Sequence, residues 1–348
     1  MFTSFPSRCT QTEVSHINEV LRKGWLAPGD NASTLENEVA KKCGKSNGVL
    51  LNSKTSALFI ACFASGIHEG VHVLVPAICD QSIFSILQHL RAEIIFYDVS
   101  LDSFTLPPDE LSKLITDEIT HVIISNPLSV KYDYSSLDKV IIIEDLYFSH
   151  VENPTTTVSI LTFDGVCSLA LFSDAAIADR ALCTRDWGRV GTQDEDIAKR
   201  YDGWELDGVK YDYKFVYGHL GFNFKSCEMS ATIALDRFRM IADKVDDFNE
   251  LRKPEYSQII KLSENGYSFL VKCDRQDELV ARLLAMQVTA HTMAALNIKL
   301  AEKGDFPNSK DLYENYMFIN RVADHKKNHI VVSAVLDLVD ERRNEEED

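Results

Sequence analysis

Short apolar segments alternate with helix-like segments through the first half of the chain, and this alternation most constrains the fold. The apolar segments predict β-strands at residues 48–51, 72–76, 92–98, 121–125 and 140–144. Helical patterns separate several of them, at residues 53–65, 83–90 and 111–116. Strands that alternate with helices form a parallel sheet with helices on both faces. We therefore expect an α/β fold whose mostly parallel sheet lies within residues 45–185.

The pattern changes after residue 245, which predicts a separate small domain. We expect a large α/β domain at residues 1–245, a small α+β domain at 246–340 and an acidic tail at 341–348. Within the small domain we expect a strand near 267–273 and helices at 277–286, 310–322 and 331–342. The tail, ERRNEEED, is too highly charged to pack in a core.

Composition and charge exclude several classes of function. The chain has 348 residues, 45% of them hydrophobic and 26% charged, as in ordinary globular proteins. Its net charge of -17 argues against nucleic-acid binding and against docking on anionic lipid. No apolar run reaches the length of a membrane span, and the N-terminus, MFTSFPSRCTQTE, lacks the order of a signal peptide.

The cysteines are scattered, at positions 9, 43, 62, 79, 167, 183, 227 and 273, and no CxxC pair occurs. Zinc and iron–sulfur sites need clustered ligands, so we predict no metal. Disulfides are rare in the cytoplasm, and scattered thiols in apolar segments fit a reducing compartment. We therefore expect a cytoplasmic protein whose thiols are reduced.

Two acids end the apolar run at 140–143, because Glu144 and Asp145 follow it directly. A buried charge is costly unless it is paired or hydrogen-bonded. The pair could cap a helix or mark a surface turn. It could also hold a cofactor, because open α/β sheets bind ligands beyond the carboxyl ends of their strands.

A polar turn, NSKTS at 52–56, follows the first predicted strand. Its hydroxyls and the N-terminus of the next helix could bind an anion. The other interpretation is that these residues only cap the helix. The residues by themselves leave both interpretations open.

Three segments, taken together, resemble one family. They are NSKTSALFIA at 52–61, IIIEDLYFSH at 141–150, and RDWGR…YDYKFVYGHLGFNFKSCEMSA at 185–231. They resemble the DegT-type nucleotide-sugar aminotransferases, which are pyridoxal-phosphate (PLP) enzymes of fold type I. RDWGR followed by YGHLGFNFK is most similar to the hexulose 3-dehydrase branch, whose members remove a sugar C3 hydroxyl with the pyridoxamine form of the cofactor (PMP). The resemblance covers residues 10–250.

The resemblance implies a cofactor-phosphate site at the polar turn. Ser53, Thr55 and Ser56 match the family residues that hold this phosphate. Lys54 stands where the family usually has a small glycine. The lysine could add a cation to the phosphate, or it could be strained if the backbone there needs a positive φ.

The resemblance also assigns the strand-end acid and one loop residue. Asp145 matches the acid that keeps the cofactor ring nitrogen protonated, and Glu144 would face the other side of the sheet as a structural residue. Phe148 stands where the family has a polar residue, so either it lies near the ring without a hydrogen bond or the site has degraded. His150 could supply a nearby imidazole, but we favour a structural role for it. Asn223 matches the residue that reaches the cofactor phosphate of the neighbouring subunit.

Four residues of the third segment are candidates for substrate binding. Arg185 and Arg189 suit a diphosphate, although structural ion pairs are an equal alternative. Tyr217 and His219 could face the sugar. Residues 190–203, VGTQDEDIAKRYDG, carry none of the clustered cysteines of the iron–sulfur dehydrases, so we predict no cluster and no partner that would serve one.

The family's catalytic base has no counterpart. Family transaminases use a lysine that forms a Schiff base, and the dehydrase branch uses a histidine instead. Residues 162–189, TFDGVCSLALFSDAAIADRALCTRDWGR, contain neither. The segment that should carry the base is missing next to residues 163–165, so we identify no catalytic residue.

Several functional hypotheses follow. The chain could modify nucleotide sugars in deoxysugar or aminosugar biosynthesis with PLP or PMP, its lysine-dependent catalysis impaired or lost. It could instead be a pseudoenzyme that binds a nucleotide sugar or serves as a partner subunit in glycan biosynthesis. Because family members are dimers, the resemblance implies a homodimer or a heterodimer with a paralogue.

Overall fold

The computed structural model describes most of the large domain and parts of the C-terminal region. The described residues are 9–146, 152–163, 165–190, 200–201, 204–242, 253, 256–257, 259–262, 268–273, 275–285, 290–292, 304–320 and 331–338. Phe148, His150 and the acidic tail lie outside them, so the predictions made for these residues stay predictions.

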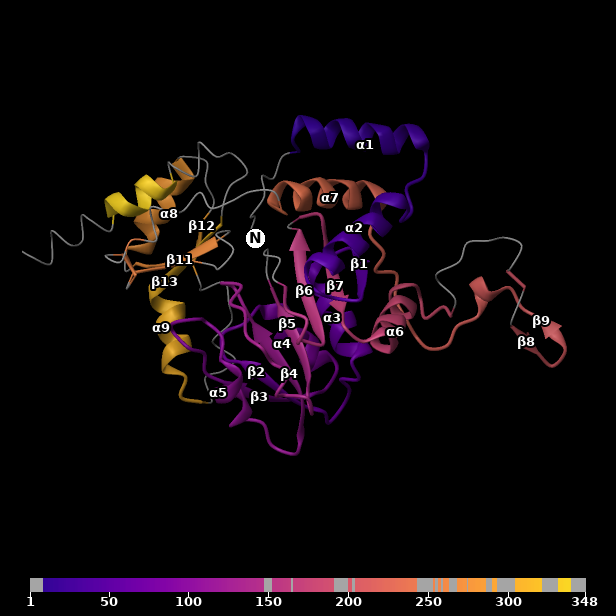
Figure 1. Cartoon of the computed structure of the whole chain (residues 1–348), viewed down its shortest axis with the longest axis horizontal. Coiled ribbons are helices and arrows are strands. Elements are labelled where there is room, and N and C mark those ends of the chain that lie inside the picture. Colours follow the sequence, from indigo (N-terminus) through magenta and orange to yellow (C-terminus); the bar gives the residue numbers. More distant parts are fainter. Residues whose placement is uncertain are drawn as a thin grey trace, which may run out of the picture.

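A seven-stranded sheet forms the centre of the large domain (Figure 1). Its strands are β1 (Asn47–Leu51), β2 (His72–Pro76), β3 (Glu93–Tyr97), β4 (Ile119–Ser125), β5 (Ile141–Asp145), β6 (Val158–Phe163) and β7 (Cys167–Phe172). They lie in the order β1-β7-β6-β5-β4-β2-β3. Only β7 runs against its neighbours, pairing antiparallel with both β1 and β6. The predicted mostly parallel sheet is confirmed, and β6 and β7 are two strands that the sequence pattern did not identify individually.

Helices cover both faces of this sheet. They are α1 (Gln11–Lys23), α2 (Asp30–Lys42), α3 (Lys54–Ala64), α4 (Gln81–His89), α5 (Pro108–Ser112), α6 (Ala175–Arg185) and α7 (Glu228–Ala242). On one face α2, α5 and α7 share a core with strand residues such as Leu50 and Ile142. On the other face α3, α4 and α6 share a core with Leu51 and Ile143. Because side chains alternate along a strand, adjacent residues serve opposite cores. Within the described residues, no helix has the length and apolar character needed to cross a membrane.

A second, antiparallel sheet occupies the C-terminal region. Its strands, β10 (Ile260–Leu262), β11 (Ser268–Lys272), β12 (Ala290–Thr292) and β13 (Tyr316–Asn320), lie in the order β10-β11-β13-β12. Helices α8 (Gln276–Ala285) and α9 (Pro307–Asn315) accompany it. The helix expected at 310–322 was wrong in part, because residues 316–320 form β13 between β11 and β12. Aromatic and branched residues in YMFIN favour a strand.

The C-terminal region packs directly on the large domain. Leu270, Leu312 and Tyr316 are buried in the same core as α2 and α7. The boundary at residue 245 stays a prediction, because residues 243–252 lie outside the described part of the chain.

An arm at residues 204–222 extends away from the body of the molecule (Figure 1). It contains the short hairpin of β8 (Glu205–Leu206) and β9 (Val209–Lys210), followed by the 3-10 turn η2 (Tyr213–Phe215). Both strands of the hairpin are exposed on all four residues.

Asp98, just after β3, provides a test of how firmly the C-terminal region is attached. Its carboxylate accepts hydrogen bonds from the Asn308 and Ser309 backbone N–H groups at 2.9 and 2.8 Å, at the start of α9. We predict that Asp98→Ala lowers the free energy of unfolding by about 1–2 kcal/mol, the usual cost of a lost helix cap. Urea unfolding measures the change. The control is Asp102→Ala, whose side chain is 92% exposed and lies 3.4 Å from the Lys261 ammonium. Equal losses in the two variants would contradict the prediction.

Candidate functional site

The two acids that end β5 lie on opposite faces of the sheet, and both are fully buried. Glu144 lies in a polar network in which Asn126 donates to its carboxylate at 2.8 Å and Asn153 and Thr156 lie within 3.4 Å. Burial raises the pKa of Glu144, although these donors and the Lys45 charge oppose the shift. The Lys45 ammonium donates to Thr156 at 2.9 Å, and burial lowers the pKa of Lys45 to about 8. Glu144 therefore has the structural role expected of it.

Asp145 faces a lysine. The Lys54 ammonium lies 2.8 Å from Oδ2 of Asp145, whose side chain has no exposed surface. The same nitrogen lies 3.0 Å from Oδ2 of Asp80. One cation thus lies between two carboxylates from different elements, because Lys54 begins α3, Asp145 ends β5 and Asp80 precedes α4. This arrangement answers the question that the sequence raised about a buried acid at a strand end.

Asp80 is part of the site although the sequence analysis did not identify it. Asp80 caps α4 by accepting a hydrogen bond from the Ser82 backbone N–H at 2.9 Å. Burial alone would raise its pKa, but the Lys54 charge and the Ser82 donors outweigh burial and lower the pKa to about 2. A capping acid just beyond the carboxyl end of β2 was the available signal, because β2 and β5 point to the same edge of the sheet.

Of the two roles considered for Lys54, the structure excludes the strained backbone, and the role as a cation beside the cofactor phosphate stays a prediction. Lys54 is the first residue of α3, and its φ is not positive. Its backbone is therefore not strained. Its side chain is 17% exposed and extends to the two carboxylates. The ammonium is therefore engaged in ion pairs within the site.

The hydroxyls of the polar turn mainly cap α3. The Ser53 hydroxyl accepts a hydrogen bond from the Ser56 backbone N–H at 3.1 Å. The Ser56 hydroxyl, which is buried, donates to the Asn52 side-chain oxygen at 2.7 Å. Ser53 and Thr55 are exposed at the helix N-terminus. The turn therefore has the capping geometry of the simpler interpretation and still presents two exposed residues.

The connection between β6 and β7 is very short. Phe163 pairs with Cys167, so only residues 164–166 link the two antiparallel strands. These residues are Asp164, Gly165 and Val166, and Gly165 has φ +69°. Neither this link nor the strands it joins contain a lysine or a histidine. The strands thus turn back directly where the family's base-bearing segment is expected.

The segments RDWGR and YGHLGFNFK are joined backbone to backbone. Bridges pair Asp186 with Asn223 and Arg189 with Tyr217. The contact requires glycine, because a Cβ on Gly221 would lie 2.2 Å from the Gly188 nitrogen. The same assembly meets the polar turn, since the Asn52 N–H donates to the Phe224 carbonyl at 2.9 Å. The spacing of these two motifs in the sequence is therefore matched by a direct contact in the fold.

Both candidate arginines have partners within the chain. Arg185 donates to Glu36 at 2.8 Å and to the Leu50 carbonyl at 3.1 Å. Arg189 lies 3.8 Å from Asp186 and 4.9 Å from the centre of the Trp187 ring. These contacts favour the structural alternative for both guanidinium groups. Glu36 also accepts the Leu50 N–H at 2.7 Å, a role that the sequence did not indicate.

The remaining candidate residues of the third segment take no part in the ion pairs of Lys54 with Asp80 and Asp145. The His219 ring lies 2.9 Å from the Thr184 hydroxyl. Tyr217 is 52% exposed, and Asn223 is also exposed. The structure thus brings Lys54 and Asp145 together, whereas Tyr217, His219 and Asn223 belong to a separate surface that meets the polar turn through its backbone.

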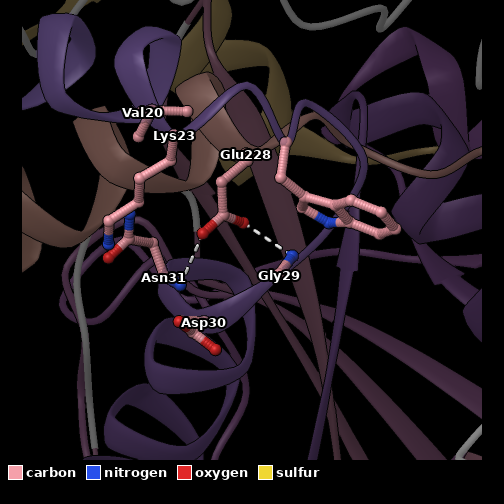
Figure 2. A pocket seen from close by; sticks show the side chains of 7 residues that line it. Val20, Lys23, Gly29, Asp30, Asn31 and Glu228 are labelled. Carbon is pink, nitrogen blue, oxygen red and sulfur yellow. Dashed lines mark hydrogen bonds between the residues drawn. The ribbon is translucent and has the colours of Figure 1, made fainter. Parts of the chain in front are cut away.

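A pocket between the α1–α2 connection and α7 offers little to an anionic ligand (Figure 2). Glu228 accepts hydrogen bonds from the Gly29 and Asn31 backbone N–H groups, both at 2.7 Å. Its carboxylate therefore caps α2 and is occupied. Asp30 adds a second acid, and Lys23 is the cation that lines this pocket. The pocket is thus not an obvious nucleotide site.

A PLP or PMP cofactor does not fit the residues present. The resemblance assigns Asp145 to the cofactor's ring nitrogen, yet Lys54 already places a cation 2.8 Å from that carboxylate. The link at 164–166 supplies no base to act beside the ring.

Among the residues that the structure describes, no group of three or more His, Cys, Asp or Glu side chains is arranged to hold a metal.

Sequence comparison places the chain in an aminotransferase family. The profile of the DegT/DnrJ/EryC1/StrS aminotransferase family matches residues 8–306. UDP-4-amino-4-deoxy-L-arabinose–oxoglutarate aminotransferase of Shewanella sediminis is 24% identical over 257 residues, 69% of this chain and 64% of that protein. The spore coat polysaccharide biosynthesis protein SpsC of Bacillus subtilis is 25% identical over 202 residues, 57% of this chain and 51% of that protein. The match thus spans about half to two thirds of the length of these relatives.

Structural comparison supports the same fold. GDP-4-keto-6-deoxymannose-3-dehydratase with bound GDP-perosamine superposes with a TM-score of 0.76 at 16% identity, covering 96% of this chain and 100% of that chain. An aminotransferase from Psychrobacter cryohalolentis gives a TM-score of 0.73 at 15% identity, covering 94% and 96%. At such identities the likeness shows the fold alone, which is the fold type I architecture expected from the sequence.

Removing the lysine should be costly. Lys54→Met takes away the cation that faces two carboxylates, one of them fully buried. We predict a loss of about 3–5 kcal/mol in the free energy of unfolding, as when one partner of a buried ion pair is removed. Adding Asp145→Asn should recover part of the loss. In urea unfolding, the control Lys310→Met should cost less than about 1 kcal/mol, because its pair with Glu314 is exposed. A small change in Lys54→Met would contradict this account.

The stabilisation from Asp80 should depend on acid pH. The pKa of Asp80 is about 2 in the folded chain and 3.8 for the free side chain. The contribution of its charge to the free energy of unfolding is therefore complete above pH 3.8 and is lost as the pH falls towards 2. We predict that the stability gap between the wild type and Lys54→Met narrows between neutral pH and pH 3. Urea midpoints at the two pH values measure the gap. A gap that stays constant would show that the ion pair does not set this pKa.

Proposed function

This chain belongs to the DegT/DnrJ/EryC1/StrS aminotransferase family, and we propose that it acts there as a pseudoenzyme, a non-catalytic partner subunit in nucleotide-sugar metabolism. The proposal rests on one observation above all, the link of residues 164–166 between β6 and β7. This short link leaves no lysine or histidine where the family's base is expected.

The lost base bears on both reactions of the family. Transamination needs a lysine that bonds covalently to the cofactor, and the dehydrase branch needs a histidine that moves a proton. The carboxylates of Asp80 and Asp145 cannot replace a lysine amine, and both are already held by Lys54. A single lysine introduced at the link should not restore activity, because the segment that surrounds the family's base is missing as well. Aminotransfer and C3 dehydration are therefore not the activities that we assign to this chain.

The arm at residues 204–222 supports a role as a subunit. Phe215 and Leu220 expose 65% and 89% of their surface, and the arm carries further exposed apolar residues. These are Trp204, Leu206, Val209, Tyr211, Tyr217 and Phe222, and Trp187 is exposed beside the arm, because its N–H donates to the Phe222 carbonyl. Exposed apolar groups gathered on one projecting segment favour a protein interface. We propose that the arm binds a second chain of this fold, either another copy or a paralogue.

Next to the arm lies a residue whose family counterpart acts across subunits. Asn223, at the base of the arm, is exposed, and the resemblance assigns its counterpart to the neighbouring subunit's cofactor phosphate. A chain without a base of its own could thus still complete the site of a catalytically intact partner. The relatives named for sugar chemistry support a nucleotide sugar as the substrate of that assembly. The scattered cysteines, which form no disulfide among the described residues, favour the cytoplasm.

Two measurements test the proposal. With PLP, glutamate and GDP-4-keto-6-deoxymannose, the purified chain should show neither amine transfer nor dehydration. In light scattering after gel filtration, it should form a dimer alone or with a family paralogue, and Phe215→Ser with Leu220→Ser should weaken that dimer. The control is Leu114→Ser, because Leu114 is 39% exposed and lies outside the arm. Turnover by the isolated chain, or a chain that stays monomeric in both settings, would refute the proposal.

A further inference from the structure

We propose that the Lys54 ammonium takes the place of the cofactor's protonated ring nitrogen, so that the chain completes its own site and excludes PLP and PMP. The inference rests on the ion pairs of Lys54 and not on the proposed partner role. It can therefore hold even if the chain is monomeric, and it can fail even if the chain pairs through its arm.

The side chain of Lys54 connects the two ends of the expected cofactor site. It leaves the backbone between Ser53 and Thr55, which the resemblance assigns to the phosphate. It ends 2.8 Å from Asp145, which the resemblance assigns to the ring nitrogen. A pyridine ring held at both ends would have to lie between these same points. The aliphatic part of Lys54 therefore lies where that ring is expected.

The charges match as well as the position. Asp145 has no exposed surface, and a buried carboxylate needs a cation or several donors. A pyridinium supplies one positive charge and one N–H to such an acid. An ammonium supplies the same charge and three N–H donors, so it can also hold Asp80 at 3.0 Å. Lys54 thus supplies the positive charge that Asp145 needs and also pairs with Asp80, which the single N–H of a pyridinium held by Asp145 could not do.

A cofactor ring that displaced Lys54 from Asp145 would break more favourable ion pairs than it formed. An incoming ring could pair with Asp145, but the ammonium would then lose one of its two carboxylates inside a site where it is 17% exposed. Asp80, which has a pKa lowered partly by Lys54, would lose its cation if the side chain swung out. A loss of this kind lowers ligand affinity tenfold for each 1.4 kcal/mol.

Binding of pyridoxamine 5′-phosphate tests the inference, because PMP needs no covalent lysine. We would titrate PMP into the wild type, Lys54→Gly, Lys54→Arg and Lys54→Gly/Asp145→Asn, and follow PMP fluorescence. Lys54→Gly should bind PMP at least about tenfold more tightly than the wild type. Lys54→Arg keeps the cation and should resemble the wild type. The double variant should lose the gain, because it lacks the acid that holds the ring nitrogen.

The outcomes separate the possible explanations. Saturable PMP binding by the wild type, as tight as in Lys54→Gly, would overturn the inference, as would a folded Lys54→Gly that gains nothing. If Lys54→Gly fails to fold, reductive methylation of the wild type replaces it. The amine of Lys54 should then react far more slowly than that of exposed Lys113, and PMP should not change its rate. Equal rates for the two lysines would refute the ion pair on which the inference depends.

Discussion

The ion pairs of Lys54 with Asp145 and Asp80 are the interaction on which the rest of the site depends. They exist because β1, β2 and β5 end at the same edge of the sheet: Lys54 begins the helix that follows β1, Asp80 caps the helix that follows β2, and Asp145 ends β5. Asp145 is fully buried, and Lys54 supplies a cation 2.8 Å from its carboxylate. The lysine makes this edge stable by means of the chain's own residues, without requiring a ligand.

Side chains alternate along β5, so its two terminal acids face opposite sides of the sheet and have different partners. Glu144 joins a buried polar network on one face, whereas Asp145 meets Lys54 on the other. The same alternation assigns adjacent strand residues to two different cores. The fold of the aminotransferase family is thus kept around a site in which, as we propose, the side chain of Lys54 supplies the cation in place of a ligand. The short β6–β7 link fits the same history, because a site without a ring has no use for a base beside it.

The sequence was sufficient to predict the sheet and the two strand-end acids on its opposite faces, whereas the loss of the catalytic base stays a prediction. It could not predict the destination of Lys54, because that depends on how α3 packs beside α4 and brings Asp80 close. It also did not identify β6 and β7, although Asp164–Gly165 between two apolar runs is a hairpin signal. The sequence predicts helix at residues 316–320 because the helical pattern of α9 continues into them, and pairing with β11 and β12 overrides this pattern.

The most direct test of the central claim is the absorbance spectrum of the wild-type chain as it is purified from cells that supply vitamin B6. The account predicts the aromatic band of the protein and no pyridoxal or pyridoxamine band. A stoichiometric cofactor band would contradict it, because the ring would then occupy the place that we assign to Lys54.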